Sequence, residues 1–359
     1  MSKKKICFIA QFPPPIHGLS KAVETLYNSE LNQEFEFEKV DITNNRKIFA
    51  NLLAISKSKA DLFYFTISQT KGGNLRDIVI LKLLEVQKKK CLIHLHGGYY
   101  RTLVDHLGGW QAKANYKAIG KLAGAIVLGP SLKWIFEGML PADKVYTVPN
   151  CVDDQYLMDA TSFESKISHT ESREIKHVLY LSNFIRSKGY PEVLQMAKLE
   201  KERVLLGEKR KLHFDFAGKF FEESEKIFFN NFVEKNGLED FVTYHGVVGG
   251  NEKKELLRVC DYFVLLTRYP NEGQPISILE AMGNGMAIIT TKHAGIRDLV
   301  QDTSNGICVD DVDVQRIYEE MLCLEHSITY VERNNRNIVL GTYTQNNYVQ
   351  NIKKLFELL

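Results

Sequence analysis

Two glutamates in the segment NEGQPISILEAMGNG, Glu272 and Glu280, lie eight positions apart and follow a strand-like run, DYFVLLT. Gly273 permits a tight turn after the strand, and Pro275 suits the first position of a short helix. The start of a helix offers unpaired amides and a partial positive charge, which together favour a diphosphate. Because a phosphate would repel nearby carboxylates, we interpret the two glutamates as ligands of sugar or ribose hydroxyls. The plainer alternative is a capped, buried helix with two incidental glutamates.

The elements that must position these residues follow an alternating pattern. Short β-branched and aromatic runs such as KICFIA alternate with amphipathic stretches such as SKAVETLYN, which is typical of βαβ units and a parallel sheet. The series restarts after a polar stretch at 159–176, which we interpret as a linker. The sequence therefore predicts an α/β fold with two Rossmann-like, doubly wound domains. Such sheets bind ligands at the carboxyl ends of their strands, so we expect the site in a cleft between the domains.

We place the division between the two predicted domains after residue 165, which gives an N-terminal domain at 1–165 and a C-terminal domain at 166–342. The remaining segment, 343–359, is predicted to be a helix that needs a surface to cover, because its apolar residues recur at helical spacing: Tyr348, Val349, Ile352, Leu355 and Phe356.

Composition and charge restrict the classes of protein. Hydrophobic residues make up 44% and charged residues 25% of the 359 residues, as in ordinary globular proteins. Segment 1–165 carries 21 Lys/Arg against 16 Asp/Glu, a surplus of five that fits either an anionic membrane surface or a solvated lysine-rich face. No apolar run is long enough to span a bilayer, and the six cysteines are scattered without metal-ligand spacing. We expect a cytoplasmic protein whose membrane contact, if any, is peripheral.

The glutamate segment resembles that of the retaining glycosyltransferases with the GT-B fold, the glycosyl transferases group 1 family, which includes glycogen synthases and bacterial capsule and exopolysaccharide glycosyltransferases. Its hallmark is two glutamates separated by seven residues in an EG-x-P context, which Glu272, Gly273, Pro275 and Glu280 reproduce. The resemblance implies that Glu272 contacts a hydroxyl of the transferred sugar and that Glu280 holds the nucleotide ribose. It further implies that sugar and phosphate are bound by backbone amides of Gln274, Ile276 and Ser277.

A second segment of the resemblance is SNFIRSKGY, after the first predicted strand of the C-terminal domain. Lys188 and Gly189 match the usual Lys-Gly of the family, which implies that Lys188 neutralises the leaving diphosphate. Many relatives carry arginine where this chain has Asn183, so Arg186 is the expected second cation and Asn183 a further donor-binding residue. The alternative for either cation is an ordinary exposed side chain.

The N-terminal half offers two further segments. In FPPPIHGLSK, His17 and Gly18 resemble the family's first loop, which lies over the donor phosphates and faces the acceptor. In HLHGGYYR, His94 and His96 alternate on a strand end and therefore point to the same side. The family frequently places a histidine there against the donor sugar, and we assign that role to His96. The residues that follow it are expected on the acceptor side: Gly97, Gly98, Tyr99 and Arg101.

The resemblance implies a retaining hexosyltransferase that needs no metal or other cofactor. We expect it to move a hexose or N-acetylhexosamine from a nucleotide-diphosphate sugar, with UDP favoured, to a saccharide or lipid-linked saccharide in bacterial surface polysaccharide synthesis or protein glycosylation. The N-terminal domain would serve the acceptor and receive the last helix, and the C-terminal domain would bind the donor. The acidic pair Asp311 and Asp313 fits a helix start better than a metal site.

The sequence bears on three alternative functions. A catalytically silent subunit that supports a partner glycosyltransferase would share the fold, and so would a nucleotide-sugar epimerase. A dehydrogenase is excluded because neither domain opens with a GxGxxG turn. No nucleic-acid partner is expected, and the sequence does not fix the oligomeric state.

Overall fold

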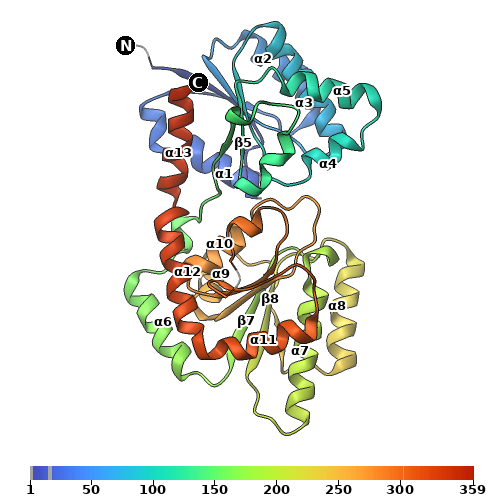
Figure 1. Ribbon diagram of the computed structural model, residues 1–359, viewed down its shortest axis with the longest axis vertical. Coiled ribbons are helices and arrows are strands. Elements are labelled where there is room, and N and C mark those ends of the chain that lie inside the picture. Colours follow the sequence, from blue (N-terminus) through green and yellow to red (C-terminus); the bar gives the residue numbers. More distant parts are fainter. Residues whose placement is uncertain (1–2, 15–17, 302) are drawn as a thin grey trace. The chain divides into compact units, whose positions relative to one another are not determined.

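The computed structural model describes residues 3–14, 18–301 and 303–359, which form two compact units (Figure 1). Unit 1 comprises Met1–Cys151, Pro270–Gln274 and Gln345–Leu359, and unit 2 comprises Val152–Tyr269 and Pro275–Thr344. The two doubly wound parallel sheets expected from the sequence are confirmed, one in each unit. In the part of the chain that the structure describes, no helix combines the length and the apolar character needed to cross a bilayer.

Unit 1 contains a six-stranded parallel sheet in the order β2-β1-β3-β4-β5-β6. The central strands are buried on both faces and therefore read as nearly continuous apolar runs. The strands are β1 (Lys5–Ala10), β2 (Glu36–Asp41), β3 (Leu62–Thr66), β4 (Cys91–His94), β5 (Gly124–Val127) and β6 (Val145–Thr147). The helices are α1 (Gly18–Tyr27), α2 (Ile48–Lys57), α3 (Lys71–Val86), α4 (Tyr100–Asp105), α5 (Gly109–Ile119) and α13 (Gln345–Leu358).

Different helices cover the two faces of this sheet. One core contains side chains of β1, α1 and α13, and in it the Phe356 ring lies 6.1 Å from Phe8 and 5.9 Å from Tyr64, centroid to centroid. All five apolar residues that the sequence singled out in α13 are buried there. Right-handed crossovers from β2 through β5 place α2, α3 and α5 on the opposite face, as Figure 1 shows.

Unit 2 contains a second six-stranded parallel sheet in the order β12-β11-β10-β7-β8-β9. The strand order reverses between β7 and β10, so their carboxyl ends flank the topological switch point where ligands bind in such sheets. The strands are β7 (Lys176–Leu181), β8 (Leu212–Ala217), β9 (Val242–Tyr244), β10 (Tyr262–Leu265), β11 (Ala287–Thr291) and β12 (Gly306–Val309). The helices are α6 (Ala160–Ser172), α7 (Tyr190–Leu205), α8 (Glu223–Asn236), α9 (Gly250–Val259), α10 (Ile276–Gly283), α11 (Val314–Leu324) and α12 (Ile328–Thr342).

The polar stretch at 159–176, interpreted above as a linker, is mainly helix α6, and that interpretation was wrong. Asp159 caps the helix by accepting a hydrogen bond from the Ser162 amide at 2.9 Å. Its inner side packs on unit 2, where the Lys166 ammonium donates to the Asn284 carbonyl oxygen at 2.8 Å. The contacts therefore place the boundary between the units at Cys151, before the expected division after residue 165.

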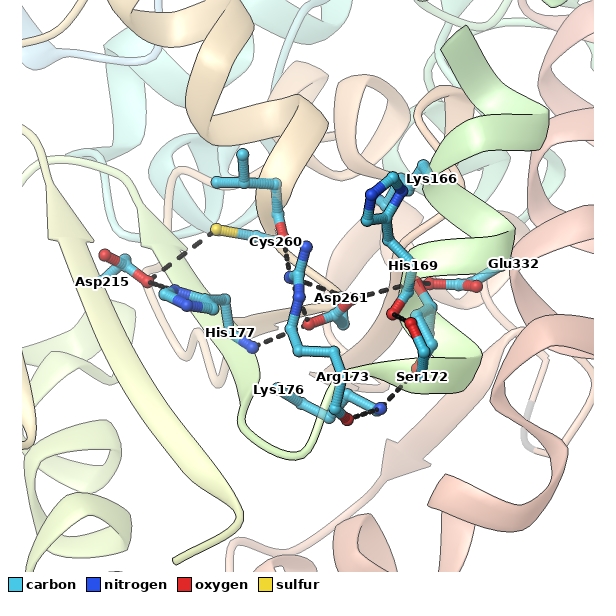
Figure 2. A network of polar contacts seen from close by, with 12 residues as sticks. Lys166, His169, Ser172, Arg173, Lys176, His177, Asp215, Cys260, Asp261 and Glu332 are labelled. Carbon is cyan, nitrogen blue, oxygen red and sulfur yellow. Dashed lines mark hydrogen bonds and ion pairs between the residues drawn. The ribbon is translucent and has the colours of Figure 1, made fainter. Parts of the chain in front are cut away.

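A buried polar network joins α6 to the amino-terminal ends of β7 and β10 and to α12 (Figure 2). The Asp261 carboxylate accepts from the Thr170 hydroxyl at 3.1 Å and from the His177 amide at 2.8 Å, and it forms an ion pair with Arg173 at 3.2 Å. Oε1 of Glu332 on α12 lies 3.3 Å from the same hydroxyl, and burial raises the pKa of the Glu332 carboxyl. These contacts fix α6 and α12 against the sheet of unit 2.

Candidate functional site

Two histidines lie together at the carboxyl end of β4 in unit 1. The rings of His94 and His96 stack with centroids 3.9 Å apart, so both point to the same side of the strand. His94 is buried, and its Nδ1 lies 2.6 Å from the Tyr64 hydroxyl. Burial, with a smaller contribution from His96, holds the pKa of His94 well below its usual value, so the ring is neutral at pH 7. His96 is half-buried and stacks on this fixed neutral ring.

The turn that carries Glu272 packs directly on the turn that follows His96. A Cβ added to Gly273 would lie 2.7 Å from the His96 carbonyl oxygen and 2.8 Å from the Cα of Gly97. A Cβ on Gly97 would in turn lie 2.7 Å from the Asn271 carbonyl oxygen. The two backbones approach so closely only because both positions are glycine. Pro270–Gln274 is therefore grouped with unit 1, although its neighbours in sequence belong to unit 2.

Gln274 anchors the end of this turn within unit 1. Its side-chain oxygen accepts from the Asn150 amide at 2.7 Å, its backbone oxygen accepts from Asn150 Nδ2 at 2.9 Å, and its Nε2 donates to the Leu128 carbonyl at 3.3 Å. The side chain of Gln274 is thus occupied by structural contacts. Glu272, two residues earlier, is 9% exposed.

The residues that follow His96 in the chain, expected on the acceptor side, differ in their contacts. Gly98 and Tyr99 lead into α4, where the Tyr99 amide donates to Gln69 Oε1 at 2.6 Å. Arg101 is held by Asp105 at 3.0 Å and by the Glu137 carbonyl oxygen at 2.7 Å, so its guanidinium already has partners within unit 1. Gly18 is exposed and begins α1. His17 lies outside the described residues.

In unit 2, Lys188 lies at the switch point between β7 and β10. It ends a 3₁₀ turn, Arg186–Lys188, and is followed by Gly189 in the left-handed conformation with φ +85°. A Cβ on Gly189 would lie 2.6 Å from the Leu266 carbonyl oxygen, so glycine allows this turn to contact the end of β10. The Lys188 ammonium lies 5.1 Å from the centre of the Tyr269 ring, immediately before the Glu272 turn.

Arg186 and Asn183 are placed differently from Lys188. The Arg186 guanidinium pairs with Glu225 of α8 at 3.1 Å and lies 4.3 Å from the centre of the Phe228 ring. Its charge is therefore neutralised on the α8 side of the turn and not beside Tyr269. Asn183 is exposed, and its backbone oxygen accepts from the Tyr180 hydroxyl at 3.0 Å.

Helix α10 begins at Ile276, with Pro275 as its N-cap and no acidic residue in its first turn. Pro275 therefore lies one residue before the helix, whereas the sequence analysis predicted it at the first helical position. Ile276 and Ser277, the first two helical residues, are half-buried, and their amides belong to the helix end that carries the partial positive charge.

Glu280 lies one turn further along α10 and is almost fully buried. Its Oε1 accepts from the Lys253 ammonium of α9 at 2.7 Å, and that ammonium lies 4.2 Å from the centre of the Tyr156 ring. Burial raises the pKa of Glu280, and the Lys253 charge opposes that rise. Because a carboxylate can accept at both oxygens, Lys253 occupies one of two acceptor positions.

Lys253 and Tyr269 were missed by the sequence reasoning. Lys253 belongs to an ordinary amphipathic helix, NEKKELLRV, and no motif distinguishes it from the neighbouring lysine. The acidic pair that was judged a helix start behaves as such, since Asp313 caps α11 by accepting from the Arg316 amide at 3.1 Å. No group of three or more metal-ligating side chains with suitable geometry occurs within the described residues.

Residues 162–338 match the family model described as glycosyl transferases group 1. These residues belong to the glycosyl transferases group 1 family. The match covers both segments on which the resemblance in unit 2 was based, the Lys188 turn and helix α10.

Solved structures share the fold over almost the whole chain. A structure of Anabaena HepE in complex with UDP has a TM-score of 0.76 at 14% identity and covers 99% of this chain and 100% of its own. A sucrose-phosphate synthase from Thermosynechococcus elongatus has a TM-score of 0.72 at 13% identity and covers 99% of each chain. These similarities establish the GT-B fold of the two sheets.

Curated relatives match shorter segments. Mannosylfructose-phosphate synthase of Agrobacterium fabrum is 26% identical over 168 residues, which are 46% of this chain and 36% of that protein. The colanic acid biosynthesis glycosyltransferase WcaL of Salmonella typhimurium, named as putative, is 33% identical over 89 residues, which are 24% and 22% of the two chains. The chain thus spans about a third or less of the length of these relatives.

Proposed function

We propose that this protein is a retaining, metal-independent glycosyltransferase that uses a UDP-sugar and transfers its hexose or N-acetylhexosamine to a saccharide or lipid-linked saccharide. The observation that carries the proposal is the packing of the Glu272 turn on the His96–Gly97 turn, directly before the first residues of α10. Within unit 1 a carboxylate and an imidazole, both suited to sugar hydroxyls, are thereby carried on two turns in contact, and the chain continues from the Glu272 turn into a helix start suited to phosphate.

The donor diphosphate would lie against the start of α10, with Lys188 as the fixed cation. Negative charge grows on the diphosphate as the bond to the sugar breaks, and a preorganised cation and helix end stabilise that charge. Lys188 is the stronger candidate because it lies at the switch point on Tyr269. Arg186 could contribute only by leaving Glu225, which neutralises it. Asn183 and Gly18 complete the proposed donor-binding set, and the side chain of Gln274 acts by fixing the turn.

The sugar and ribose would be held by the two glutamates and by His96. The buried neutral ring of His94 fixes the orientation of His96 by stacking, so that His96 meets a sugar hydroxyl without reorganising. Glu280 would bind the ribose with the oxygen that Lys253 does not occupy. The departing phosphate would accept the proton of the acceptor hydroxyl on the same face of the sugar, which retains the anomeric configuration without a protein base.

Similar proteins support UDP as the nucleotide of the donor and polysaccharide synthesis as the pathway. HepE has been solved with UDP, with UDP and glucose, and with UDP-glucose. WcaL is named for colanic acid and AmsK of Erwinia amylovora for amylovoran biosynthesis. We extend these properties to this chain as a role in bacterial surface polysaccharide synthesis at the cytoplasmic side of the cell membrane.

The test compares Lys188→Ala with Lys198→Ala, an exposed lysine of α7. Removing a preorganised charge from such a site costs about 3–4 kcal/mol, so kcat for UDP release from a UDP-sugar should fall by about 100- to 1,000-fold in the first variant only. Wild-type turnover in a folded Lys188→Ala protein would contradict the donor site. A wild-type protein that binds UDP but releases none from any UDP-sugar would favour the silent subunit, and an isomerised sugar on intact UDP would favour the epimerase.

A further inference from the structure

Helices α2, α3 and α5 each present an outward stripe that combines apolar and basic side chains. On α2, Phe49 is 83% and Leu53 is 57% exposed. On α3, Val86 is 68% exposed, and on α5, Trp110 is 66% exposed. The stripes follow helical spacing, so each lies along the side of its helix that faces away from the sheet. They are Phe49, Leu53 and Lys57 on α2; Leu75, Val79, Lys82 and Val86 on α3; and Trp110, Lys113 and Lys117 on α5, with the exposed Lys121 just after its end.

These stripes belong to one continuous surface of unit 1, which we call the α2–α3–α5 face. α3 contacts α2 on one side and α5 on the other, and the three helices cover the same face of the sheet (Figure 1). An amphipathic helix of a globular protein normally turns its apolar residues to the core and polar residues to the solvent. On this face large apolar residues point outward as well, which indicates an interaction surface.

The charge of this part of the chain is strongly one-sided. Segment 45–121 contains 14 Lys/Arg and 4 Asp/Glu, a net charge of +10, whereas the whole chain carries +2. Three of the acids already pair inside unit 1, because Asp77 pairs with Arg76, Glu85 with Lys82 and Asp105 with Arg101. The fourth, Asp61, accepts from the Lys5 amide. The surplus is therefore a set of lysines and arginines that these acids do not neutralise.

The run of three lysines at 88–90 is not the main source of this surface. The Lys89 ammonium donates to the carbonyl oxygens of Ile55, Ser56 and Ser58, where it closes the end of α2. The Lys90 ammonium donates to the Leu359 carbonyl oxygen. Two of the three lysines thus serve the structure of unit 1, and the exposed basic residues are those of the helical stripes.

We propose that the α2–α3–α5 face docks unit 1 on an anionic lipid surface. Lysines next to outward apolar and aromatic side chains match the two layers of a membrane interface, because the ammonium groups meet anionic headgroups while Phe49 and Trp110 enter the acyl boundary. The inference stands on geometry and charge alone and goes beyond the proposed sugar transfer.

The experiment measures flotation of the full-length protein with vesicles of phosphatidylcholine, either pure or mixed with phosphatidylglycerol, and needs no sugar donor. We expect binding to the mixed vesicles only, weakened by high salt. Changing Lys113, Lys117 and Lys121 together to glutamine should lower the partition coefficient by about 100-fold, since each charge near an anionic surface contributes about fivefold. The matched control changes three exposed lysines of unit 2 to glutamine, and we expect no loss: Lys198, Lys235 and Lys254.

A second pair of variants tests the apolar part of the face. Phe49→Ser with Leu53→Ser should lower partition by about 100-fold or more, because each buried side chain contributes about 10-fold or more. Leu205→Ser with Leu206→Ser, two exposed leucines of unit 2, should change nothing. The proposal is overturned by equal binding to both vesicles, by no binding, by unaltered binding of both test variants, or by selective binding to soluble heparin. Donor turnover of the same samples reports separately on the proposed function.

Discussion

Replacing Gly273 with alanine should separate the Glu272 turn from His96. The new Cβ would lie 2.7 Å from the His96 carbonyl oxygen and 2.8 Å from the Gly97 Cα, and both atoms are backbone atoms that cannot rotate away. Restoring a carbon contact of about 3.5 Å requires a shift of about 0.7 Å between the two turns. Overpacking of this kind costs about 1–3 kcal/mol of stability. A misplacement of about 1 Å costs about 100-fold in rate, so we expect kcat to fall about 10- to 100-fold.

The assay is UDP release from a UDP-sugar, with the melting temperature followed by circular dichroism on the same preparation. The matched control is Gly72→Ala at the start of α3, where an added Cβ meets nothing within 4 Å. We expect the control to keep the wild-type rate. If Gly273→Ala also keeps both the rate and the melting temperature of the wild type, then the contact between the two turns does not position the site and the reasoning fails.

Three further predictions concern unit 2. Gly189→Ala should lower the free energy of unfolding in urea by more than Gly207→Ala does. Both glycines have positive φ, +85° and +94°, and that strain alone should cost about 1 kcal/mol at Gly207, where an added Cβ meets nothing. At Gly189 the added Cβ would also lie 2.6 Å from the Leu266 carbonyl oxygen. Burial would raise the pKa of Asp215, but hydrogen bonds with His177 and His245 outweigh it and lower the pKa from 3.8 to about 2. This depressed pKa contributes about 2 kcal/mol to the free energy of unfolding, which is present above pH 4 and lost as the pH falls to about 2. In urea titrations, Asp215→Asn should therefore be less stable than the wild type at pH 7, and its stability should fall less than that of the wild type between pH 4 and pH 2. An equal acid loss in both proteins would refute it. Lys253→Ala should leave the Glu280 carboxylate buried without its cation and raise the pKa of Glu280 further. The variant should lose about 3 kcal/mol of unfolding free energy at neutral pH and regain part of it toward pH 4, where the carboxyl takes up a proton. Unchanged stability at both pH values would contradict that pairing.

The sequence predicted the fold because parallel sheets leave a strong local pattern. The apolar runs KICFIA and GAIVLG are strands β1 and β5, and their burial on both faces is what makes them apolar throughout. The segment around Glu280 was also predictable, because the short helix expected after Pro275 is α10, which ends at Gly283, and Gly285 follows with φ +80°. The same-side placement of His94 and His96 follows from strand alternation alone.

The contacts that the sequence did not predict join segments far apart in the chain. Nothing in NEGQP indicates that Gly273 packs on His96, because the fit depends on two glycine backbones separated by more than 170 residues. The Lys253–Glu280 pair likewise depends on how α9 and α10 meet on the sheet. Helix α6 was missed for a local reason. Its SHTESRE composition is polar, while the buried residues Phe163 and Ile167 keep a helical spacing after the Asp159 cap, a signal that the polar composition obscured.

The assignment of Pro270–Gln274 and α13 to unit 1 has a consequence for how the protein is made. The ribosome synthesises the first 151 residues well before these two segments, which come after most or all of unit 2. Until α13 emerges, the apolar surface around Phe8 and Tyr64 lacks the helix that covers it, and Gly97 lacks its partner turn. A fragment cut at Cys151 would therefore expose a wide hydrophobic face, and nascent unit 1 would be a natural client for chaperones.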